Sequence, residues 1–176
     1  MDTSQFFAAV RPELVGDNGP SVRPGDDPLL YGSAVMTPCN PVEVRSFNTF
    51  EITYTVGRIG LDDTGGIRVC FRMISDFGKL QITDPSSPNF LSAKCSGSGK
   101  ISLRIAPEGQ RPWSLAITAQ LNGGYLNEGA QLILTFGDTS QGSPGFMMQT
   151  FAEGGFEFKV MTDVQATGTV LPLDQQ

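Results

Sequence analysis

The residue types that carry most enzyme chemistry are sparse in this chain, and one of them is missing. None of the 176 residues is a histidine. Histidine is the usual proton-transfer group near neutral pH and the commonest metal ligand, so its absence excludes serine–histidine and cysteine–histidine hydrolases and histidine-ligated metal sites. Catalysis would then fall to carboxylates, lysine, tyrosine or cysteine. We therefore favour a binding or structural role and expect no enzyme activity from this chain alone.

Paired carboxylates are the best route to catalysis without histidine, as in glycoside hydrolases. The candidate carboxylates are Asp62, Asp63, Asp76, Asp84, Asp138, Glu153 and Glu157. Most of them stand in segments rich in glycine and proline, where an aspartate commonly accepts hydrogen bonds from its own turn. Turn formation is the favoured interpretation, and a carboxylate-based glycoside hydrolase ranks third among the functions considered.

Bound cofactors are not indicated by any motif. The acidic loops offer oxygen ligands for calcium, but their spacing matches no calcium-binding loop. The glycine-rich run Gly137–Gly145 lacks the Gly-Lys-Ser/Thr ending of a phosphate-binding loop. We expect neither a metal nor a cofactor.

The cysteines and the charge restrict compartment and partners. Cys39, Cys70 and Cys95 are odd in number and far apart, which favours reduced thiols; a Cys39–Cys95 disulfide stays open. The first residues lack the pattern of a secretory signal, so a cytoplasmic location is favoured. The net charge of −6 opposes binding to nucleic acid or anionic membrane surfaces. No apolar run approaches the roughly 20 residues of a membrane-spanning helix.

Alternation of apolar and polar residues marks a series of short strands. The expected strands are Leu29–Thr37, Val44–Val56, Ile67–Ile74, Phe90–Ser96, Ile101–Ile105, Trp113–Asn122, Ala130–Phe136, Phe146–Phe151, Gly155–Asp163 and Thr169–Leu173. In the third of these, Arg68, Cys70 and Arg72 share one face. Cys70 is expected to be a buried small hydrophobe, and the arginines to be solvated or ion-paired, Glu51 being one candidate partner.

Many short strands separated by turn residues indicate an all-β protein. The expected fold is an antiparallel β-sandwich, immunoglobulin-like or jelly-roll, because no helical periodicity follows Leu29. Residues 1–28 are interrupted by proline, glycine and aspartate and are expected to form an irregular N-terminal arm. Residues 29–176 then form a single sandwich domain.

Carbohydrate binding is the second hypothesis for the function, since β-sandwiches bind sugars on exposed aromatic platforms and this chain has several aromatic residues. The available rings are Trp113, Tyr31, Tyr125, Phe77 and Phe90. Trp113 follows Arg111-Pro112 at a junction between loop and strand, where it serves either as a platform or as a lid on the sheet. Core packing is the commoner fate of a single tryptophan.

A collinear set of short motifs resembles a known family. The motifs are Tyr54-Thr55-Val56-Gly57, Gly60-Leu61-Asp62-Asp63, Ile67-Arg68-Val69, Phe71-Arg72, Ser75-Asp76-Phe77-Gly78, Gln81, Asp84-Pro85, Pro88-Asn89-Phe90, Arg111-Pro112-Trp113, Thr135-Phe136-Gly137-Asp138, Ser143-Pro144-Gly145 and Gln149-Thr150-Phe151. Their order is similar to the N-terminal β-region of a large bacterial family of unknown function. Longer members of that family continue into a metal-dependent hydrolase region similar to the PHP phosphoesterases.

The resemblance implies an accessory module associated with a hydrolase, because the family's metal ligands lie in a region beyond the matching motifs. This chain departs from the family at Phe77, where tryptophan is frequent, and at Thr139, where arginine is common. The partner implied is a catalytic hydrolase domain or another protein.

The polar residues of the matching loops are the candidate contact set, at one end of the sandwich. They are Asp76, Gln81, Asp84, Asn89, Arg111, Trp113, Asp138 and Gln149. Loops on a rigid framework carry function more often than the framework does, so these residues are expected to contact a partner or ligand. The competing interpretation is that they only build turns.

Overall fold

The computed structural model describes residues 29–72, 76–108, 112–113 and 115–173, and within them every regular element is a strand. The strands are β1 (Ser33–Thr37), β2 (Phe47–Asn48), β3 (Phe50–Thr55), β4 (Gly66–Phe71), β5 (Leu91–Cys95), β6 (Lys100–Pro107), β7 (Leu115–Asn122), β8 (Gln131–Phe136), β9 (Phe146–Met147), β10 (Phe158–Asp163) and β11 (Leu171–Pro172). The arm expected over residues 1–28 lies outside the described residues.

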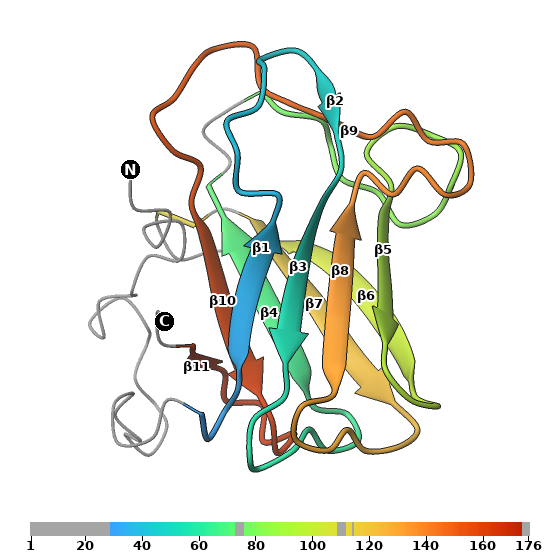
Figure 1. The fold of residues 1–176 in the computed structure, drawn as a ribbon, viewed down its shortest axis with the longest axis vertical. Coiled ribbons are helices and arrows are strands. Elements are labelled where there is room, and N and C mark those ends of the chain that lie inside the picture. Colours follow the sequence, from blue (N-terminus) through green and yellow to red (C-terminus); the bar gives the residue numbers. More distant parts are fainter. Residues whose placement is uncertain (1–28, 73–75, 109–111, 114, 174–176) are drawn as a thin grey trace.

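Two antiparallel sheets face each other, which confirms the expected sandwich (Figure 1). One sheet has the order β1-β3-β8-β5 and the other β11-β10-β4-β7-β6. The pairings β3–β8, β5–β8, β4–β7 and β4–β10 join strands that are distant in the chain, as in Greek-key folds and unlike a simple meander. A short pair, β2–β9, stands apart at one end of the sandwich.

The strand pattern in the sequence is largely confirmed, but several strands are shorter than expected, and β1, β7, β10 and β11 begin two to four residues later than predicted. The expected strand Val44–Val56 divides into β2 and β3 at Thr49, whose hydroxyl donates a hydrogen bond to the Gly137 carbonyl at 2.7 Å. Only the start of Phe146–Phe151 is a strand, β9, because β2 offers just two residues for pairing. The alternating residues Ile52 and Tyr54 are both 0% exposed.

A cluster of phenylalanine rings fills one end of the core. Phe71 contacts Phe77, Phe136, Phe156 and Phe158, with ring centroids 5.3–6.5 Å apart. Phe77 and Phe156 belong to connections, whereas the other rings belong to strands β4, β8 and β10. Aromatic contacts of this kind add to the apolar area that the rings bury, so the cluster ties these connections to the sheets.

The two ends of the sandwich differ in the length of their connections (Figure 1). At one end the strands are joined by short segments, 56–65, 96–99, 123–130 and 164–170. The other end gathers the segments 38–49, 76–90 and 137–157, and we call it the loop end. Strand β2 and strand β9 lie within it.

None of the three cysteines takes part in a disulfide bond. Cys39, Cys70 and Cys95 are free thiols, and the Cys39 and Cys95 thiols donate to the Met36 and Gly99 carbonyls instead of bonding each other. Cys70 is 1% exposed, as expected of a buried hydrophobe. The part of the chain that the structure describes has no helix long and apolar enough to span a membrane.

Candidate functional site

Backbone hydrogen bonds between its segments hold the loop end together. The Gly78 amide donates to the Met147 carbonyl at 2.8 Å, and the Asn89 amide to the Gly145 carbonyl at 2.9 Å. Gly137 has a φ of +65°, and a Cβ on it would lie 2.1 Å from the Phe146 nitrogen, so glycine is required at this close approach. The segments therefore form one connected unit.

Gln81 and Asp84 organise the turn that closes at Pro88. The Gln81 side-chain oxygen accepts from the amides of Thr83 and Asp84, both at 2.9 Å, and its nitrogen donates to the Asp84 carbonyl at 2.7 Å. Asp84 accepts from the hydroxyls of Ser86 and Ser87 at 2.7 and 2.6 Å. The side chains of Gln81 and Asp84 thus support the turn itself.

Hydrogen bonds hold the Asp84 carboxylate in its ionised form. The Ser87 hydroxyl, then the Ser86 hydroxyl and amide, lower the pKa of Asp84 to about 2. Replacing Ser87 with alanine should raise the pKa of Asp84 towards its ordinary value of 3.8, because the largest stabilising bond is lost. Carbon-13 NMR of the side-chain carboxyl measures this directly.

Ser86→Ala is the matched comparison, and it should raise the pKa of Asp84 less than Ser87→Ala does, since the Ser86 hydroxyl lowers that pKa less than the Ser87 hydroxyl does. An Asp84 titration unchanged by Ser87→Ala would contradict the geometry of this turn.

Asn89 links two segments of the loop end. Its φ of 64° lies in the left-handed region, which asparagine tolerates better than most residues. Its side-chain oxygen accepts from the Met147 amide at 2.8 Å, and a Cβ added at Gly78 would lie 2.0 Å from that oxygen. Asn89 is therefore a structural clamp between the segments 76–90 and 137–157.

Asp76 and Asp138 fasten further pairs of segments. Asp76 accepts from the amide and the hydroxyl of Thr150 at 2.8 and 2.6 Å, and these bonds lower its pKa. Asp138 accepts from the Ser92 hydroxyl at 2.5 Å and the Ser140 amide at 2.9 Å. Partial burial opposes ionisation of Asp138, but these bonds outweigh it and lower the pKa. Both carboxylates are thus used to fasten segments of the chain to one another.

Gln149 is the candidate whose side chain is most deeply buried within the loop end. It is 6% exposed, and its side-chain nitrogen donates to the Phe151 carbonyl at 3.0 Å. Its side-chain oxygen is buried without a hydrogen-bond partner among the described residues. Six of the eight candidates thus meet at the loop end, where most of their polar atoms are used internally.

Trp113 does not join the other six. Trp113 precedes β7 at the same end of the sandwich, but its side chain packs on the outer face of the five-stranded sheet against Cys70, Ala116 and Met161. Because it is only 5% exposed, it is not the open platform that the carbohydrate-binding reading requires. Arg111 lies outside the described residues. Tyr125, which is 50% exposed, lies in the 123–130 connection at the opposite end.

Arg68 of β4 and Arg72, which directly follows β4, both form ion pairs, though not with Glu51. Arg68 forms an ion pair with Glu108 at 2.5 Å, and Arg72 one with Glu157 at 2.8 Å. Glu51 belongs to β3 in the other sheet and accepts from the Thr135 hydroxyl, so the suggested partner was wrong.

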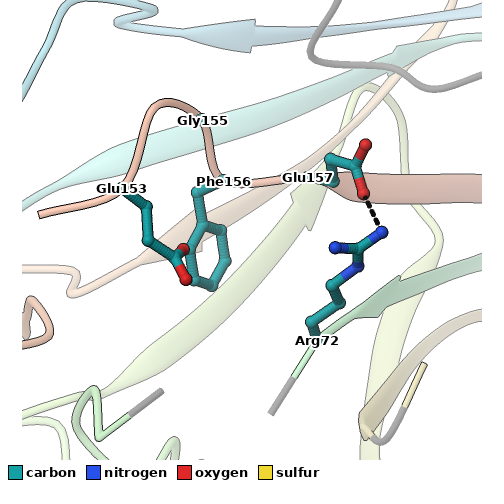
Figure 2. A pocket seen from close by; sticks show the side chains of 5 residues that line it. All are labelled: Arg72, Glu153, Gly155, Phe156 and Glu157. Carbon is teal, nitrogen blue, oxygen red and sulfur yellow. Dashed lines mark ion pairs between the residues drawn. The ribbon is translucent and has the colours of Figure 1, made fainter. Parts of the chain in front are cut away.

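A small pocket lies beside Arg72, and Figure 2 shows the Arg72–Glu157 ion pair at one side of it with Glu153 and Phe156 at the other. Its volume is about 70 Å³. Pockets for drug-sized ligands measure roughly 300–1,000 Å³, so this one is too small for a sugar chain. Because Glu157 is held by Arg72, the pocket does not present the free carboxylate pair of a glycoside hydrolase.

The loop end also carries exposed apolar side chains, which the sequence analysis did not predict. Val42, Val44, Phe47, Ile82 and Phe151 are all at least 36% exposed. Five of the eight exposed large hydrophobic residues in the described chain therefore lie in its segments. The Arg45 amide donates to the Gln149 carbonyl and the Met148 amide to the Ser46 carbonyl, which bring the segments carrying Phe47 and Phe151 together.

Comparison of the chain with protein-family models, curated proteins and solved structures finds no match. The class of this protein is therefore given by its fold alone, which is an antiparallel β-sandwich. Any function has to be inferred from the arrangement of its own residues.

Proposed function

We propose that this chain is a non-catalytic β-sandwich module that docks on a partner protein through the loop end. The observation that carries the proposal is the concentration of exposed large hydrophobic side chains there, including Phe47 and Phe151 at 41% and 44% exposure. Exposed apolar side chains gathered in one region and rimmed by polar groups are typical of protein-interaction surfaces. Aromatic residues are also the commonest sources of binding energy at such surfaces.

The polar candidate residues support docking indirectly, because their hydrogen bonds fix the loop end and are not contacts with the partner. Asp76, Asn89 and Asp138 hold the segments in fixed positions, so a partner meets a surface that is already ordered. A surface that is ordered before binding loses less conformational entropy on association. The partner that the family resemblance implies is a PHP-like catalytic hydrolase domain.

Introducing negative charge at the exposed phenylalanines of the loop end should weaken docking. Phe47→Asp combined with Phe151→Asp is expected to weaken binding to a PHP-like domain encoded downstream of Gln176 or in a neighbouring gene. The loss should be at least about tenfold in Kd, because two aromatic contacts are removed and two charges are buried. Isothermal titration calorimetry with the purified domain measures it.

Val35→Asp is the matched control, because Val35 is 55% exposed on β1 and lies outside the loop end. This variant should bind the partner as the unchanged chain does. Equal affinity of the double variant and the control, or the lack of any hydrolase gene in both places, would refute the proposed partner.

A further inference from the structure

A buried cation, Lys159, lies on the outer face of the five-stranded sheet. Lys159 of β10 is 3% exposed and pairs in register with Cys70 of β4. Its ammonium lies 6.0 Å from the centre of the Trp113 ring. Among the described residues, no carboxylate forms an ion pair with it. The acidic groups near enough to act on the charge of Lys159 are the Cys70 thiol and the Glu108 carboxylate, and Glu108 is already bonded to Arg68.

The burial of Lys159 is unfavourable as it stands. Removing an ammonium from water costs far more than an aromatic ring returns through a cation–π contact. The same burial lowers the pKa of Lys159, which is the expected response of an uncompensated cation. A negative charge from outside the described residues would therefore stabilise the buried ammonium of Lys159.

Two buried hydrogen-bond donors on the same face of the sheet have no partner among the described residues. They are the Trp113 indole nitrogen and Arg68 Nε. Arg68 pairs in register with Met161, two residues along β10 from Lys159, so both cations lie on one face of the sheet. Buried donors without partners are rare in native proteins and commonly mark a bound ion or water.

We infer that this face binds one oxyanion, a carboxylate or phosphate group, with Lys159 supplying the charge and Trp113 and Arg68 supplying N–H donors. The ion pair between Arg68 and Glu108 cancels, which leaves the single positive charge of Lys159. One oxyanion neutralises that charge, and its oxygen atoms can accept hydrogen bonds from several donors at once. A halide ion accepts less directional hydrogen bonds than an oxyanion does.

The single tryptophan makes the site directly measurable, because all tryptophan fluorescence of this chain comes from Trp113. Inorganic phosphate and acetate are titrated separately into the full chain at constant ionic strength, with chloride as the reference. We expect a saturable change in emission with millimolar phosphate or acetate and none with chloride. The anion that binds with the lower Kd shows whether a phosphate or a carboxylate is the preferred group.

Lys159→Met should weaken anion binding at least about tenfold, which is 1.4 kcal/mol, while the chain stays folded because an unpaired buried charge is removed. Lys94→Met, in β5 of the other sheet, should bind as the unchanged chain does. The anion should also raise the midpoint of thermal unfolding of the unchanged chain but not that of Lys159→Met. No saturable response to either anion, or an equal response in Lys159→Met, would overturn the inference.

Discussion

Replacing Phe71 with alanine is expected to lower the free energy of unfolding by about 3–5 kcal/mol, as truncation of a buried phenylalanine usually does. Phe71 is 1% exposed and contacts rings from two strands and from two connections of the loop end. The substitution therefore removes apolar burial and leaves a cavity where the connections are attached to the sandwich. Urea unfolding followed by far-ultraviolet circular dichroism measures the loss.

A second effect of Phe71→Ala follows from the position of its neighbours. Phe77 and Phe156 lose the ring on which both pack, so backbone amides of the loop end should exchange faster with deuterium than those of strand β6. Phe151→Ala is the comparison, since Phe151 is 44% exposed and should change stability by no more than about 0.5 kcal/mol. Equal losses in the two variants would show that the ring cluster does not stabilise the sandwich.

The strands were predictable because alternation reports which side of a strand is buried. Ile52 and Tyr54 of β3 and Val69 of β4 are each 0% exposed, as their spacing indicates. Alternation says nothing about which strands pair. The neighbours of β8, which are β3 and β5, follow from packing of the whole chain and not from any local pattern.

The candidate site was less predictable, for a physical reason that Trp113 illustrates. The residue was expected to begin a strand, but β7 begins only at Leu115, so the alternation does not extend to Trp113. Its burial depends on Cys70 and Met161 from two other strands. Glu108 likewise meets Arg68 across 40 positions of the chain. A pairing of this kind depends on sheet register, so neither the Arg68 partner nor the buried Lys159 could be read from sequence.

For the polar loop residues, the residue types correctly indicated that these positions matter, but they did not indicate what the side chains do. The sequence marks Asp84 and Asn89 as unusual loop residues, and the structure places both at positions where they bond the backbone or neighbouring hydroxyls. Turn-building and exposure of a contact surface are separate properties. Here the polar residues fix the segments, while Phe47 and Phe151 provide the exposed surface.

Alkaline pH should destabilise the folded chain through two buried acids, Cys70 and Tyr54. Burial raises the pKa of Cys70 from 9.0 to about 11, and burial raises the pKa of Tyr54 from 10.0 to about 12 against a small opposing hydrogen bond from Thr162. Because both folded-state values are higher, the unfolded chain loses these protons first as pH rises. Their stabilising contributions are complete below pH 9.0 and 10.0 and disappear as pH passes through about 11 and about 12.

Each contribution is at most about 3 kcal/mol, since one pKa unit corresponds to about 1.4 kcal/mol. Lys159 acts in the other direction, because burial lowers its pKa and the folded chain gains stability as that ammonium is neutralised. Urea midpoints measured at intervals from about pH 8 upward should therefore fall most steeply between pH 10 and about 11, where the windows of Cys70 and Tyr54 overlap, and Tyr54 alone should continue the fall towards about pH 12. Cys70→Ala should flatten the lower part of the decline and Tyr54→Phe the upper part. A midpoint that stays constant over this range in the unchanged chain would contradict the burial of both groups.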